Sequence, residues 1–188
     1  MKLLIIKVPE DIRKEAEERS QKLAELHKGR WTKFDSPDDN YSGEIGRIVI
    51  QRYFKENGLN PISDDELHGK SDKFDIKIKE KLVEVKTQII KDYEPQLHWR
   101  CEINKKQKDR EDRKFDFVVF IKLNLVKNLA YVVGFISYDK FMEKAKFHPK
   151  GEIMDDNKKS WAVKEDKYDV RIDELNNSIV DLIDILKH

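Results

Sequence analysis

Two runs of nearly continuous apolar residues stand out along the chain. Residues 115–123 read FDFVVFIKL and residues 129–137 read LAYVVGFIS. Such runs are typical of strands buried on both faces, so both segments are expected to be interior strands of a β-sheet. Upstream, residues 75–78 and 82–90 alternate between apolar and polar side chains. This alternation predicts a β-hairpin whose turn is Lys79-Glu80-Lys81.

Most other apolar residues recur at helical spacing. A short strand at 2–8 precedes a predicted helix at 9–28, and a second helix is predicted at 43–57 with Ser42 as its N-cap. A polar, turn-rich loop of about 13 residues separates the two helices. A further short helix is expected at 141–145.

The charged segments give weaker patterns. Residues 102–113 read EINKKQKDREDR, which is compatible with a helix capped by Asn104. Residues 148–169 are charged and irregular, with one strand indicated near 161–163. An amphipathic helix is expected to close the chain from 173 to 186.

Length and composition narrow the class of protein. The chain has 188 residues, which suits one hydrophobic core, so a single domain spanning residues 1–188 is expected. Lys and Arg number 38 and Asp and Glu number 37, giving a formal charge of +1. Bulk charge therefore does not indicate a nucleic-acid partner, and any basic surface must be local.

Cysteine usage and hydropathy indicate the compartment. Cys101 is the only cysteine, which excludes an intrachain disulfide and a cysteine-based zinc cluster and suits a reducing compartment. No apolar stretch approaches the roughly 18 residues of a membrane span, and the N-terminal apolar run is too short for a signal peptide. We expect a soluble, cytoplasmic protein with no membrane partner.

The predicted hairpin also carries candidate chemistry. Alternate side chains of a strand share a face, so Glu84 and Lys86 point the same way, while Val83 and Val85 enter the core. Asp75, on the paired strand, is expected to face outward with them. Two nearby carboxylates suit Mg²⁺ or Mn²⁺, and a lysine can orient or deprotonate water or neutralise charge on a phosphate. Two carboxylates and a lysine of this kind are suited to metal-assisted hydrolysis of a phosphodiester.

The pattern of an acid two residues before a lysine is not specific by itself. It occurs five times, at Asp75-Lys77, Glu84-Lys86, Asp112-Lys114, Asp156-Lys158 and Glu165-Lys167. Only Glu84-Lys86 lies in a hydrophobic strand that follows a suitably spaced Asp. The alternative interpretation is an exposed ladder of salt bridges across the hairpin.

The order of these features resembles the PD-(D/E)xK phosphodiesterase superfamily, which has the restriction-endonuclease-like fold. The resemblance covers about residues 42–123: a helix with Glu44, a strand with Asp75, a strand with Glu84-x-Lys86, a basic helix and a buried strand. It implies an α/β fold with a mixed central β-sheet flanked by helices. The core is expected at approximately 42–137, with N- and C-terminal helical additions.

The resemblance also implies roles for single residues. Asp75 and Glu84 would hold the metal, Mg²⁺ or Mn²⁺ as its substitute, with Lys86 and Glu44 completing the catalytic set. Phe74 stands where the family name has proline, and Asp72 is a rival to Asp75 as the metal ligand. Glu44 has a plainer alternative, as a favourable acid in the first turn of its helix.

Several other residues are candidates for binding. Gln88, on the Glu84 face, or Gln107, on the following helix, could supply a further polar contact. A basic strip contains Lys105, Lys106, Lys108 and Arg110, but acids interrupt it, so a solvated helix is the alternative to a DNA-contacting one.

Three functions follow from these features. The first is a metal-dependent endonuclease that hydrolyses DNA, and a homodimer would suit cleavage of both strands. The second is a catalytically inactive nucleic-acid-binding or assembly module with the same fold. The third is a small interaction protein whose charged hairpin is only surface.

Overall fold

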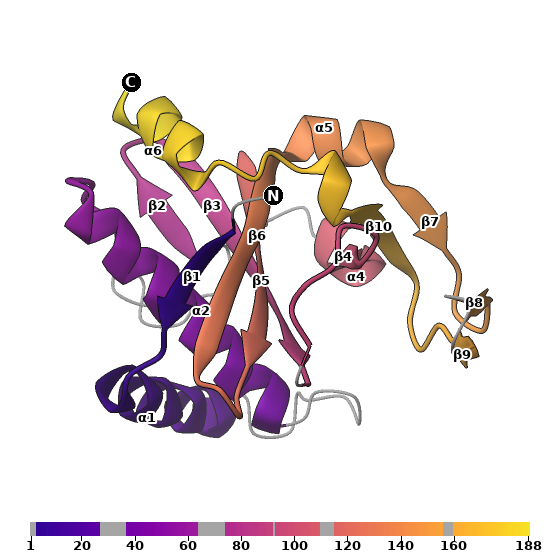
Figure 1. Ribbon diagram of the computed structural model, residues 1–188, viewed down its shortest axis with the longest axis horizontal. Coiled ribbons are helices and arrows are strands. Elements are labelled where there is room, and N and C mark those ends of the chain that lie inside the picture. Colours follow the sequence, from indigo (N-terminus) through magenta and orange to yellow (C-terminus); the bar gives the residue numbers. More distant parts are fainter. Residues whose placement is uncertain (1–2, 27–36, 64–73, 92, 110–114, 156–159) are drawn as a thin grey trace.

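A mixed five-stranded β-sheet forms the centre of the protein (Figure 1). The computed structural model describes residues 3–26, 37–63, 74–91, 93–109, 115–155 and 160–188. The strand order is β1-β6-β5-β3-β2; β3 and β5 are parallel, and the other neighbouring pairs are antiparallel. The strands are β1 (Leu4–Lys7), β2 (Ile76–Ile78), β3 (Lys81–Ile90), β5 (Phe117–Asn124) and β6 (Leu129–Ser137).

The predictions for the central strands and the hairpin are confirmed. β5 lies between β3 and β6, and β6 lies between β5 and β1, so both apolar runs form interior strands. β2 and β3 pair as a hairpin in which Ile76 lies opposite Val83. Lys79 has a φ of 53° in its turn, a conformation that lets the two strands reverse direction tightly.

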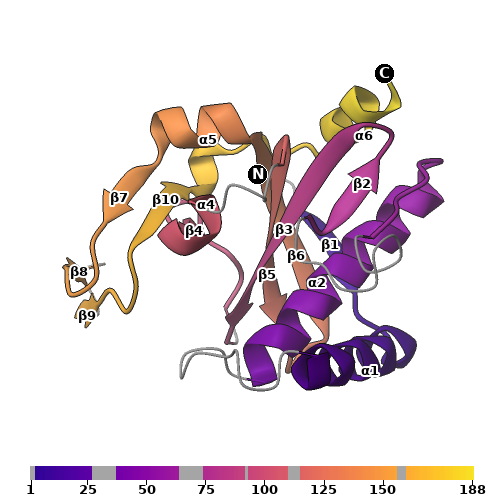
Figure 2. The ribbon, with the colours of Figure 1, turned by 180° about the vertical axis from the view of Figure 1, so that it is seen from behind.

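Three helices cover one face of this sheet, which we call the α2 face (Figure 2). They are α1 (Glu10–Leu26), α2 (Pro37–Glu56) and α6 (Ile179–Lys187). Their apolar side chains, such as Ile48 of α2 and Leu182 of α6, pack with Val83 and Val85 of β3 in one core. Among the described residues, no helix is long and apolar enough to cross a membrane.

A second core covers the opposite face, which we call the α5 face. Phe141 of α5 (Tyr138–Lys144) packs here with residues of a three-stranded antiparallel sheet ordered β4-β10-β7. Leu82 and Ile90 of β3 pack against this core. The additional elements are β4 (Arg100–Asn104), α4 (Lys105–Lys108), β7 (Lys146–His148), β10 (Lys167–Arg171), a 3-10 turn (Ile172–Glu174), and a β8 (Ile153–Asp155) and β9 (Ser160–Ala162) hairpin.

The starts of two helices differ from the sequence predictions. α2 begins at Pro37, so Ser42 is buried inside the helix and its prediction as an N-cap is wrong. Proline suits a first helical turn, because the turn uses no hydrogen bond from that nitrogen. α6 begins at Ile179, after the 3-10 turn, and Ser178 is its N-cap.

The charged segments contain more strand than the sequence predicted. Residues 100–104 form β4 with alternating burial. The helix predicted with Asn104 as its N-cap is confirmed at its start, because α4 begins at Lys105 with Asn104 as its N-cap, but α4 covers only Lys105–Lys108. Residues 110–114 lie outside the described part of the chain. The strand predicted near 161–163 corresponds to β9, but β7, β8 and β10 were not predicted.

The packing of α2 on β3 gives a first testable prediction. A Cβ atom built on Gly46 would lie 1.9 Å from Oγ1 of Thr87 and 3.3 Å from Cδ1 of Ile121. Gly46→Val should therefore lower the free energy of unfolding by about 1–3 kcal/mol, measured by urea denaturation.

Gly43 provides the matched control in the same helix. A Cβ atom there meets nothing within 4 Å, so Gly43→Val should change stability by less than about 0.5 kcal/mol. Equal effects at the two positions would contradict the close approach of α2 to β3.

Candidate active site

The two faces of β3 carry different chemistry. Val83 and Val85 belong to the core on the α2 face, and Thr87 meets Gly46 of α2. Because side chains alternate along a strand, Glu84, Lys86 and Gln88 lie on the α5 face. β3 therefore presents a charged stripe to the side of the sheet that the three-stranded sheet and α5 cover.

Glu84 and Lys86 form an ion pair on this stripe. The Nζ of Lys86 donates a hydrogen bond to Oε1 of Glu84. The Glu84 side chain is 0% exposed and that of Lys86 is 18% exposed. The expectation of an outward-facing Glu84 is therefore wrong, because the second core covers this face; the pair is too buried to be an exposed salt-bridge ladder.

Asp75 lies beside the same part of β3. It directly precedes β2, and continuation of the Ile76–Val83 pairing places it opposite Glu84. Its Oδ2 accepts a hydrogen bond of 2.7 Å from the backbone N–H of Val85, next to the point where the pairing of β2 with β3 ends. The structure thus brings Asp75, Glu84 and Lys86 to one short segment of β3.

Glu44 lies in a different setting. It is 7% exposed on α2, the helix that covers the α2 face, and its Oε2 accepts hydrogen bonds of 2.5 and 3.2 Å from Arg47. Since α2 begins at Pro37, Glu44 is beyond the first turn, so the alternative of an ordinary first-turn acid is wrong. Because α2 covers the α2 face and Glu84 lies on the α5 face, the structure does not bring Glu44 together with Glu84.

The donor set fits a hard divalent cation. Carboxylate oxygens are the ligands that Mg²⁺ prefers, and it commonly uses only one or two carboxylates together with water and substrate phosphate. Asp75 and Glu84 are two such donors on adjacent strand positions. Among the described residues, no three His, Cys, Asp or Glu side chains gather as a metal-binding group. Asp72 lies outside the described residues.

Gln88 continues the stripe and contacts a residue that the sequence analysis missed. Its Oε1 accepts a hydrogen bond from Nζ of Lys122, which lies opposite it on β5. Lys122 is 2% exposed, and burial lowers the pKa of its ammonium group. The sequence did contain a signal for this residue: Lys122 lies inside the apolar run FDFVVFIKL, and charged residues are rare in interior strands.

The described lysines of the basic strip are already paired. Lys105 pairs with Asp109, Lys108 lies 3.4 Å from Asp109, and Lys106 lies 3.0 Å from Glu165. These contacts favour the solvated-helix interpretation of the strip, although contact with DNA stays a prediction. Gln107 lies half-buried on α4, whereas Arg110 is outside the described residues.

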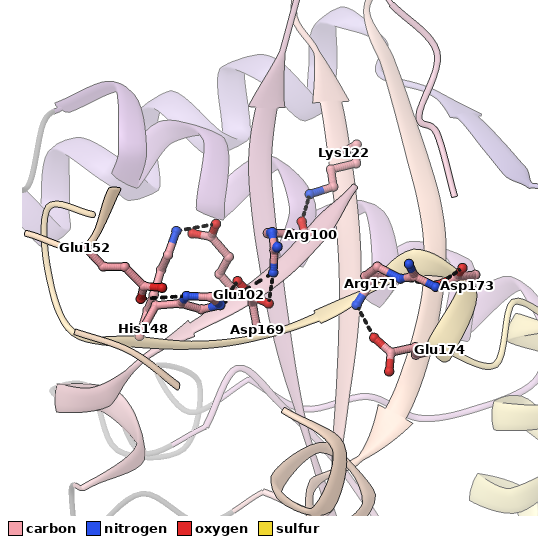
Figure 3. Close-up of polar contacts among 10 residues, drawn as sticks. Arg100, Glu102, Lys122, His148, Glu152, Asp169, Arg171, Asp173 and Glu174 are labelled. Atoms are coloured by element: carbon pink, nitrogen blue, oxygen red, sulfur yellow. Dashed lines mark hydrogen bonds and ion pairs between the residues drawn. The ribbon is translucent and has the colours of Figure 1, made fainter. Parts of the chain in front are cut away.

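A buried polar cluster lies on the three-stranded sheet (Figure 3). Asp169 of β10, 2% exposed, accepts a hydrogen bond of 2.7 Å from Arg100, and its other oxygen lies 3.1 Å from Nε2 of His148. Nδ1 of His148 lies 2.9 Å from Glu152. Burial raises the pKa of Asp169, and Arg100 opposes that shift. The cluster joins all three strands of this sheet, and no sequence motif indicated it.

Comparison with known proteins does not assign the chain to a family. No protein-family model matches the chain, and no curated protein matches it either. The candidate site therefore stands on its residues and their geometry.

Proposed function

We propose that the protein is a Mg²⁺-dependent endonuclease that hydrolyses DNA phosphodiester bonds. The observation that carries this proposal is the Glu84–Lys86 ion pair. A fully buried carboxylate joined to a lysine is costly on a sheet face that is otherwise apolar at Leu82 and Ile90, and such groups are candidates for function. The neighbouring carboxylate of Asp75 completes an acid–acid–lysine set.

The arrangement of the elements supports a restriction-endonuclease-like core. The helix α2, the antiparallel hairpin of β2 and β3, and the parallel partner β5 come in the order that the resemblance to PD-(D/E)xK phosphodiesterases implies, with β4 and the short helix α4 between β3 and β5. The hairpin carries the candidate residues at the edge of the mixed sheet.

Each residue of the set has a role in this proposal. Asp75 and Glu84 would hold Mg²⁺, which stabilises charge developing on the phosphate and lowers the pKa of bound water. Lys86 positions water or neutralises the phosphate, and its contact with Glu84 fixes the direction of its ammonium group. Glu44, on the helix that covers the opposite face of the sheet, is not part of this set. A homodimer would place one such site on each strand of a duplex.

Metal-dependent stabilisation tests this proposal. Because a cation that binds only the folded state stabilises it, Mg²⁺ or Mn²⁺ at about 100 times its dissociation constant should add about 2.7 kcal/mol to the stability. The melting temperature measured by differential scanning calorimetry should rise accordingly with cation concentration.

Two variants and a control make the measurement specific. Asp75→Asn and Glu84→Gln should each reduce the cation-induced rise, whereas Glu80→Gln, at a 93%-exposed side chain in the same hairpin, should not. An equal rise in all four proteins would place the cation elsewhere. Tight DNA binding in EDTA with no cation effect would favour the catalytically inactive module.

A further inference from the structure

Lys122 is a buried lysine that the proposed mechanism does not use. Its Nζ donates to two neutral acceptors, Oε1 of Gln88 and, at 2.5 Å, the backbone carbonyl of Arg100. Figure 3 shows the contact with Arg100. It thereby links β5 to β3 and to β4. Within the described ranges, no acidic side chain lies within ion-pair distance of it, although a buried charge ordinarily has such a partner.

These contacts determine how the Gln88 amide is oriented. A lysine ammonium group has three hydrogens to donate and no lone pair to accept with, so it holds the oxygen of the amide. The Gln88 side chain is exposed while Lys122 is buried. The amino group, Nε2, is therefore the end of the amide that can donate to a ligand.

The ligand on this part of the strand should be an anion. Gln88 lies two positions beyond Lys86 on the α5 face, and the two lysines Lys86 and Lys122 flank it. A donor of this kind next to two cationic groups is complementary to a phosphate oxygen. An amide with its oxygen outward would repel the same group.

The geometry points to Gln88 as a residue that donates a hydrogen bond to a DNA phosphate, with Lys122 as the positioning residue that orients it. This inference rests on the proposed function in taking DNA as the ligand. It adds a contact next to the acid–acid–lysine set, and that contact serves to bind substrate without taking part in metal binding.

Gln88→Glu separates binding from stability. The glutamate can pair with Lys122, so the melting temperature should stay the same or rise, but a carboxylate now faces the phosphate. The dissociation constant for a fluorescein-labelled duplex, measured by anisotropy in EDTA, should increase by about tenfold or more. Gln21→Glu, the same change at an exposed position of α1, should alter it by less than about twofold.

Lys122→Met tests the positioning role. Replacing a buried charge with an apolar side chain of similar length should keep or raise the melting temperature. Because the amide is then free to turn, the dissociation constant should increase by about threefold to tenfold. If this variant fails to fold, Gln88→Glu alone decides, since it leaves Lys122 in place.

The outcomes distinguish this inference from the proposed function. If the wild type cuts DNA and Gln88→Glu binds as tightly as Gln21→Glu, the inference is overturned and the nuclease stands. If the wild type binds without cutting and Gln88→Glu binds weakly, the inference is supported and the nuclease is overturned. If the wild type does not bind DNA at all, both are overturned.

Discussion

Glu84→Gln should lower the rate constant of DNA cleavage, kcat, by about 100-fold or more. The substitution keeps the size of the side chain but removes the charge that holds the cation and directs Lys86. Lys86→Arg should have an effect of similar size, because a guanidinium group keeps the charge but neither matches the geometry nor exchanges a proton near neutral pH. Plasmid nicking with Mg²⁺ and with Mn²⁺ provides the measurement.

Conservative replacements are needed because the pair is buried. Alanine at either position would leave an unpaired charge in a site where Glu84 is 0% exposed, at a cost to stability of about 3–5 kcal/mol. A loss of activity in such an alanine variant would then reflect unfolding of the protein and not a catalytic role of the residue.

A second acid–lysine pair in the same hairpin is the control. Lys77 lies 3.4 Å from Glu80, and the Glu80 side chain is 93% exposed. Glu80→Gln and Lys77→Arg should therefore retain cleavage within about twofold. Full activity in Glu84→Gln, or equal losses at the two pairs, would remove Glu84 from the catalytic set.

Phe141→Ala should lower the free energy of unfolding by about 3–5 kcal/mol. Phe141 of α5 is 0% exposed, and its ring centroid lies 6.2 Å from that of Phe120 on β5. Its loss would leave a cavity in the second core, which covers the α5 face and buries Glu84. Urea denaturation followed by circular dichroism measures the change.

Phe147 is the matched control for this substitution. It lies on β7 and is 41% exposed, so Phe147→Ala should cost less than about 1.5 kcal/mol. A loss at Phe141 no greater than that at Phe147 would mean that the second core contributes little to stability.

The sequence predicted the elements whose side-chain pattern reflects simple burial. Both apolar runs are interior strands, and the alternation at 75–90 is the β2–β3 hairpin. The placement of Glu84 and Lys86 on one face of the strand also followed from the period of two in a strand.

Short strands with buried charges could not be predicted in the same way. In β10, two charged residues are buried because other strands supply ion-pair partners. Lys167 pairs with Glu102 of β4, and Asp169 pairs with Arg100 of β4 and His148 of β7. Charged residues normally indicate exposure, and their partners here are distant in sequence. The burial of Glu84 was missed for a related reason, because the elements that cover it come from residues 100–175.

Cleavage of DNA by the wild-type protein is the most direct test of the central proposal. Supercoiled plasmid, linear duplex, branched and single-stranded DNA should each be incubated with Mg²⁺, with Mn²⁺ and with EDTA. The proposal predicts that at least one substrate is cut with a divalent cation and that none is cut in EDTA. Failure to cut any of them with either cation, together with tight DNA binding in EDTA, would contradict the nuclease and favour the inactive module.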